Sequence, residues 1–143
     1  MTSESDKGTM QFILRRAVDE AVLIPELEAI LGFALDPIDG PPGTSEACYS
    51  IQRFSQGFAM YVAIYWNAKV HPLIVNVDAA LQLAKITGDA VVTDLPEDDP
   101  DSDVPDVWCI AEPSGKLFAI DEDDSYDLSR GLVLLDSSRR LLR

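Results

Sequence analysis

Alternating apolar positions are clearest in the middle of the chain, where they predict a β-hairpin. Residues 47–54 and 58–66 are rich in β-branched and aromatic residues, and the short break 55–57 separates them. Such a pair of runs is typical of two antiparallel strands. Both alternating faces of the second run are apolar, so we expect a central strand that is covered on both sides.

Before this hairpin, the pattern predicts a short helix. Pro25 suits the first helical turn, and Gly32 is a natural end. The apolar stripe between them consists of Leu27, Ile30 and Leu31.

After the hairpin, apolar residues recur with the i, i+3, i+4, i+7 spacing of a second helix. These residues are Val77, Ala80, Leu81 and Ala84. Asn76 or Asp78 can cap the start of this helix, and Gly88 can close its end.

The N-terminal part is less decided. Residues 1–9 are polar, and we expect them to be frayed. Residues 10–18 fit a strand and a helix almost equally well. Residues 36–43 contain three prolines and two glycines, which predicts a loop.

The C-terminal half predicts more strands than helices. Residues 90–95 are extended in pattern, 107–111 and 116–120 form a second hairpin, and 131–135 fit a last strand or a short helix. We therefore expect a single α+β domain over residues 1–143. Its sheet is expected to be mainly antiparallel and built from two hairpins, with two or three helices packed on it.

Negative charge is concentrated in one part of the chain. Residues 94–127 hold thirteen Asp or Glu residues and one base, Lys116, which leaves a net charge of −12. The whole chain carries −14, and residues 128–143 carry +3. Most of these carboxylates fall in 96–106 and 121–127, which we expect to be acidic loops.

This charge restricts the partners. A strongly negative field repels nucleic acid and anionic membranes and attracts basic proteins. No apolar run is long enough for a membrane span, and residues 1–6 lack the layout of a signal peptide. We therefore expect a cytoplasmic protein in which Cys48 and Cys109 are buried free thiols, although a disulfide between them remains open.

Motifs for catalysis or metal binding are absent from the sequence. The carboxylates of residues 99–103 alternate as in an EF-hand, but Val104 and Ile110 stand at the sixth and twelfth positions, which need Gly and Glu. His71 is the lone histidine, and no G-x-S-x-G elbow occurs. We expect no catalytic residue, no metal and no cofactor, and keep a small hydrolase as an alternative.

The acidic stretches are the candidate binding surface for a basic protein. Carboxylates accelerate encounter with such a partner, and aromatic residues beside them can anchor it. The alternative is that the acidic loops only keep the protein soluble. The residues predicted to bind the partner are Asp98, Asp99, Asp101, Asp103, Asp106, Trp108, Glu122, Asp123, Asp124 and Tyr126.

The order of features in residues 77–135 resembles a known class of proteins. The features are a helix with Leu81, Lys85 and Gly88, a strand at 91–92, an acidic loop, Trp108, Pro113-x-Gly115, a second acidic loop and Gly131-Leu-Val-Leu-Leu. This layout is similar to that of small bacterial immunity proteins of polymorphic toxin systems, of the contact-dependent inhibition or type VI effector kind. The resemblance implies a cytoplasmic, non-enzymatic inhibitor that binds one cognate toxin and occludes its active site.

A secretion chaperone of the type III kind is the alternative from another class. Such chaperones are small, acidic, dimeric α+β proteins that wrap an extended segment of an effector. Their usual layout is a helix followed directly by three strands, which the Pro- and Gly-rich residues 36–43 interrupt here. Oligomeric state separates the two hypotheses, and the sequence leaves it open.

Overall fold

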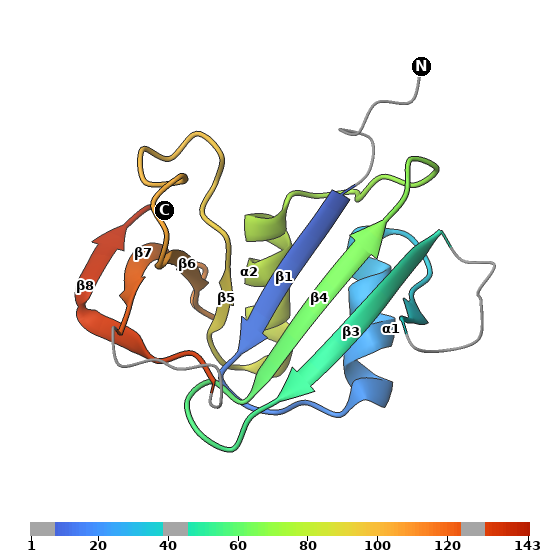
Figure 1. Cartoon of the computed structure of the whole chain (residues 1–143), viewed down its shortest axis with the longest axis horizontal. Helices are drawn as coiled ribbons and strands as arrows, with labels where there is room; N and C mark the ends of the chain where they lie inside the picture. Colours follow the sequence, from blue (N-terminus) through green and yellow to red (C-terminus); the bar gives the residue numbers. More distant parts are fainter. Residues whose placement is uncertain (1–7, 39–45, 124–130) are drawn as a thin grey trace.

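All of the described strands belong to one curled, mixed sheet (Figure 1). The computed structural model describes residues 8–38, 46–123 and 131–143. The sheet has eight strands in the order β2-β3-β4-β1-β5-β6-β7-β8. The strands are β1 (Gly8–Leu14), β2 (Asp36–Pro37), β3 (Ala47–Arg53), β4 (Met60–Trp66), β5 (Val91–Thr93), β6 (Val107–Ala111), β7 (Leu117–Glu122) and β8 (Leu134–Leu141).

Both predicted hairpins are present, as β3–β4 and β6–β7. They make up half of the sheet. The short β2 pairs with β3 in parallel, and the other neighbours pair antiparallel. The α+β class is thus confirmed, whereas a sheet built from two hairpins describes only part of it.

The segment that fitted a strand and a helix equally is the central strand β1. It pairs with β4 over its whole length and with β5 through Ile13 and Leu14. It begins at Gly8, inside the segment expected to be frayed, where a Cβ atom would lie 2.2 Å from the Trp66 ring. Tertiary pairing on both sides therefore decided between two locally equivalent patterns.

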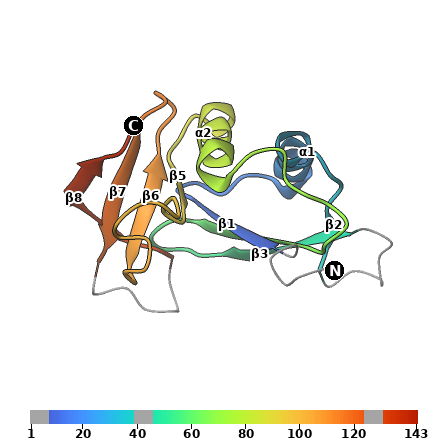
Figure 2. The same cartoon turned by 90° about the horizontal axis from the view of Figure 1, so that it is seen from above.

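The two helices, α1 (Glu20–Leu31) and α2 (Asn76–Thr87), cover the same face of the sheet. Figure 2 shows both of them on one side of β1 and β3, with β6, β7 and β8 rising steeply at the edge. The main core lies between helices and sheet. Its fully buried side chains include Phe12, Leu27, Met60, Ile64 and Leu83.

Helix α1 begins earlier than predicted. Asp19 caps it, because its carboxylate accepts the Ala21 N–H at 3.0 Å. Pro25 consequently lies inside the helix rather than in its first turn. Gly32 ends the helix as expected, in the left-handed conformation with φ 90°.

Helix α2 ends at Gly88 as predicted, but neither predicted cap serves it. Val75 is the N-cap residue and has no side-chain capping bond. The Asn76 amide instead donates to Thr93 Oγ1 at 3.1 Å and to the Asp94 carbonyl at 2.9 Å. These bonds tie the helix start to the end of β5, where the acidic loop begins.

The face of the sheet opposite the helices is only partly covered. A smaller cluster lies there, with Ile13, Phe58, Ile110, Ile120 and Leu132 buried in it. On β4, however, Tyr61 is half-buried and Tyr65 is 38% exposed. The expectation that β4 is covered on both sides therefore holds for the helix face and only in part for the other face, where Ala63 is buried.

The segment before β8 closes this smaller cluster. The Gly131 N–H donates to the Gln56 carbonyl, and the Phe58 N–H donates to the Leu132 carbonyl, both at 2.8 Å. The last strand starts at Leu134 rather than Gly131, and it runs to Leu141. Residues 131–132 thereby join the turn of the first hairpin to the far edge of the sheet.

Both cysteines are free thiols, as expected, but only Cys109 is also buried as expected. Cys109 is buried on the helix face of β6, and Cys48 is half-buried on β3. No helix among the described residues is long and apolar enough to cross a membrane.

Candidate protein-binding surface

The first acidic stretch is a loop that connects β5 to β6, as predicted. Successive tight turns shape it, because the Asp99 N–H donates to the Pro96 carbonyl and the Ser102 N–H to the Asp99 carbonyl, both at 3.0 Å. The second acidic stretch starts inside the sheet rather than in a loop. Asp121 and Glu122 are the last two residues of β7.

Asp99 is turned inward and is paired with Arg140 of β8. Its carboxylate accepts the Asp101 N–H at 2.9 Å and a bond from Arg140 Nη2 at 3.0 Å. The same Arg140 nitrogen donates to Asp101 at 2.9 Å. The Asp101 backbone bond and the Arg140 guanidinium hold the pKa of Asp99 below its ordinary value. In turn, the carboxylates of Asp99 and Asp101 raise the pKa of Arg140.

Two more arginines of the C-terminal segment pair with carboxylates elsewhere. Arg139 Nη1 lies 2.6 Å from Glu112 Oε1, and Arg143 Nη1 lies 2.7 Å from Asp78 Oδ1. The fold thus places Arg139 and Arg140 against the acidic stretch and Arg143 against helix α2. This pairing relieves some of the electrostatic self-repulsion among the carboxylates.

Other predicted carboxylates have no such internal partner. Asp98, Asp103 and Asp106 are exposed, and within the described residues no hydrogen bond or ion pair engages their side chains. The predicted surface therefore divides into an internally paired set, Asp99 and Asp101, and an open set. The open set can meet a partner's cations without first breaking an ion pair.

The two acidic stretches meet at the start of the β6–β7 hairpin. The Glu122 N–H donates to the Asp106 carbonyl at 2.8 Å, and Trp108 Nε1 donates to Glu122 Oε1 at 3.1 Å. Asp106 has a φ of 69°, a left-handed conformation that Asp tolerates better than most residues. Asp123 follows, with its N–H on the Val133 carbonyl at 2.8 Å. The structure thus brings Asp106, Trp108 and Glu122 together.

A pocket of about 590 Å³ lies between the acidic loop and β6. Carboxylates and apolar groups share its lining, and one of its residues, Trp108, is of a type enriched among the anchors of protein interfaces. The lining includes Asp94, Glu97, Asp103, Val104, Asp106 and Trp108. Asp94 and Glu97 were not among the predicted residues, although both belong to the acidic stretch.

Two predicted residues, Asp124 and Tyr126, lie outside the described residues. Tyr61, on the partly covered face, was assigned by the sequence to the core. Arg140 was also missed, although the positive charge of residues 128–143 after so acidic a stretch was a usable signal.

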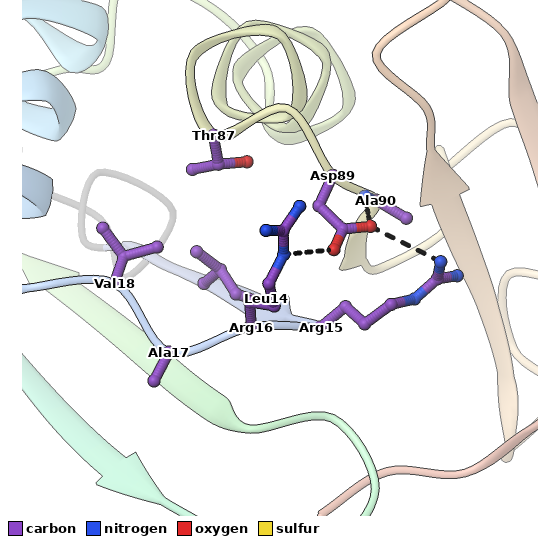
Figure 3. Close-up of a pocket in the computed structure, with 8 residues that line it drawn as sticks. All are labelled: Leu14, Arg15, Arg16, Ala17, Val18, Thr87, Asp89 and Ala90. Atoms are coloured by element: carbon purple, nitrogen blue, oxygen red, sulfur yellow. Dashed lines mark hydrogen bonds and ion pairs between the residues drawn. The ribbon is translucent and has the colours of Figure 1, made fainter.

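A separate charged cluster surrounds Asp89, just after α2 (Figure 3). Arg16 Nε lies 2.9 Å and Arg15 Nη1 3.4 Å from the Asp89 carboxylate, which also accepts the Ala90 N–H at 2.8 Å. Partial burial acts to raise the pKa of Asp89, but the Ala90 bond and both arginines outweigh it and lower that pKa. The adjoining pocket of about 110 Å³ is small, and this cluster ties β1 to the end of α2.

Two groups that could take part in catalysis differ in exposure. Burial raises the pKa of Cys109 to about 12, so this thiol is protonated at neutral pH. His71 is exposed in the segment before α2. In residues 8–38, 46–123 and 131–143, no three His, Cys, Asp or Glu side chains form a group that could hold a metal ion.

The described residues therefore form an acidic surface that includes one aromatic side chain, Trp108. Comparison of the chain with protein-family models, curated proteins and solved structures finds no match.

Proposed function

We propose that this protein is a cytoplasmic, non-enzymatic immunity protein that binds a basic toxin domain through the acidic loop 96–106 and the end of β7. One observation carries the proposal. Asp98, Asp103 and Asp106 are exposed and internally unpaired within the described chain, and Asp103 and Asp106 share a pocket with Trp108. That the basic partner is a toxin is inferred only from the resemblance in layout to immunity proteins.

The physical roles of these groups differ. Exposed carboxylates raise the association rate with a cationic surface, and their effect weakens with salt. Trp108 supplies apolar area that resists dissociation once contact is made. If the toxin acts on nucleic acid, its phosphate-binding groove is the complementary surface, and the carboxylates take the place of phosphates. The protein itself then binds neither nucleic acid nor membrane.

Two matched triple variants test this proposal. D98N/D103N/D106N neutralises the open set. E26Q/D36N/E46Q removes the same charge from helix α1, strand β2 and the residue before β3, and β2 is the edge strand at the other end of the sheet from β8. The tagged proteins are used to capture partners from source cells, and association rates are then measured with the purified partner at low and high salt. We expect the first variant to slow association about tenfold at low salt and the second to have little effect.

Three results would contradict the proposal. Equal losses in both variants would show that net charge, rather than this surface, attracts the partner. A partner that binds through an unfolded segment to a dimer of this chain would favour the chaperone. Enzymatic turnover of a captured small molecule would favour the hydrolase.

A further inference from the structure

Another pocket, separate from the two described above, opens on the face of the sheet opposite the helices. Its volume is about 340 Å³, and Ile13 and Leu132 are its buried apolar residues. Three aromatic residues line the rest, together with Glu122 and Gln52. They are Phe54, Tyr61 and Trp108, each half-buried. None of the described residues that line this pocket is basic.

Two of the three rings are held in place by hydrogen bonds that lead to a carboxylate. Trp108 Nε1 donates to Glu122 Oε1 at 3.1 Å. The Tyr61 hydroxyl donates to Gln11 Oε1 at 2.7 Å, and Gln11 Nε2 donates to Asp94 Oδ1, also at 2.7 Å. Fixed rings lose little freedom on binding, which favours a ligand that contacts their faces.

Charge selects the kind of ligand. A cation is attracted to the faces of aromatic rings, and carboxylates next to the rings strengthen that attraction. Trp108 lines this pocket and also the acidic pocket with Asp103 and Asp106, so the two pockets adjoin at its side chain. The carboxylates repel an anionic group and attract a neutral group less strongly than a cation.

We propose that this aromatic pocket takes an arginine side chain of the basic partner. A guanidinium is planar, stacks on aromatic faces and is less strongly hydrated than an ammonium, so it suits a half-buried site better than lysine. This inference rests on the proposed function and identifies the group by which the partner is anchored. Trp108 and Tyr61 are the residues that contact it.

The test uses acetyl-arginine-amide as the probe and its uncharged isostere, acetyl-citrulline-amide, as the control. Both are titrated into the full chain and followed by NMR. The Trp108 indole N–H is the reporter, and Trp66, which packs against Gly8 and Phe33, is the internal reference. We expect saturable shifts at Trp108 and none at Trp66, with citrulline at least fivefold weaker.

Variants locate the site. Tyr61→Leu should weaken arginine binding about tenfold, which corresponds to about 1.4 kcal/mol. Tyr65→Leu is the matched control, because Tyr65 lies on the same strand and face but outside the pocket. As a control for folding, the NMR signals of residues away from the substitution should be unchanged in both variants.

Equal binding of citrulline, no shift at Trp108, or equal loss in both variants would overturn the inference. If arginine fails to bind while D98N/D103N/D106N still loses the partner, the pocket assignment is wrong and the proposed function stands. If arginine binds but source cells yield no basic partner, the proposed function is wrong instead. A second copy of this chain in the pocket would appear as a dimer in sedimentation and would also contradict the inference.

Discussion

Asp106 shows how one residue organises the candidate surface. Its left-handed backbone, with φ 69°, turns the acidic loop into β6, and its carbonyl receives the Glu122 N–H. Asp adopts this conformation more readily than residues with larger side chains. The same residue keeps an exposed carboxylate beside Trp108, so backbone geometry and surface charge are combined at one position.

Asp89 makes a pH-dependent contribution to stability. Its pKa is lowered below the ordinary 3.8 in the folded state, so its ion pairs stabilise the fold above that pH. This stabilisation is lost as the pH falls through the folded-state pKa. Asp89→Asn should lower the unfolding free energy by about 1 kcal/mol at pH 7, because Arg15 and Arg16 are largely exposed and the pairs are screened.

Urea unfolding of both proteins at several pH values measures this effect. The difference between wild type and Asp89→Asn should shrink as the pH drops below 3.8. A difference that stays constant with pH would mean that the carboxylate charge contributes nothing.

At the scale of elements, β8 is the strand on which the candidate surface depends. Arg139 lies over the Phe118 ring at 5.2 Å, and Arg140 holds Asp99 and Asp101. The segment just before this strand, 131–132, is fixed to the β3–β4 turn. Arg140 of β8 therefore positions the acidic loop through contacts with residues 41 and 39 positions earlier in the sequence.

Substitution of Gly131 tests how tightly residues 131–132 pack against the β3–β4 turn. A Cβ atom there would lie 1.9 Å from the Phe58 carbonyl oxygen, which belongs to the backbone and cannot move aside easily. We expect Gly131→Ala to destabilise the protein by about 2 kcal/mol, measured by thermal unfolding. Gly88→Ala is the control, because that site is open and only its positive φ costs energy, about 1 kcal/mol. Equal effects of the two changes would show that the 131–132 contact is not tightly packed.

At the scale of the whole molecule, some of the excess carboxylates in the described chain are paired with arginines and others are not. The chain carries −14, yet its C-terminal arginines neutralise selected carboxylates and leave others open. Consequently, fewer carboxylates are available to a partner than the acidic stretch of the sequence contains. A partner would meet Asp98, Asp103 and Asp106 before the paired residues.

Removing Arg140 should have two effects. Arg140→Gln leaves buried Asp99 without its cation, so the melting temperature should fall more than in Asp101→Asn, where the half-exposed partner is lost. It also unmasks two carboxylates, so association with a basic partner should become faster at low salt. Differential scanning calorimetry and stopped-flow mixing measure the two effects. A melting temperature unchanged by Arg140→Gln would show that the pair does not hold the loop.

The sequence by itself determined the features whose signals are local. Alternating apolar residues with short breaks between the runs predict the two hairpins. Gly32 and Gly88 predict where the two helices end, because glycine adopts the left-handed conformation found there. Prolines and charged residues predict the loop 96–106. The tertiary structure alone decided that β1 is a central strand, that Tyr61 faces a pocket and that Arg140 meets Asp99. Each of these depends on which strand lies beside which. Pairing between distant segments is selected by packing of the whole sheet, and no local pattern records it.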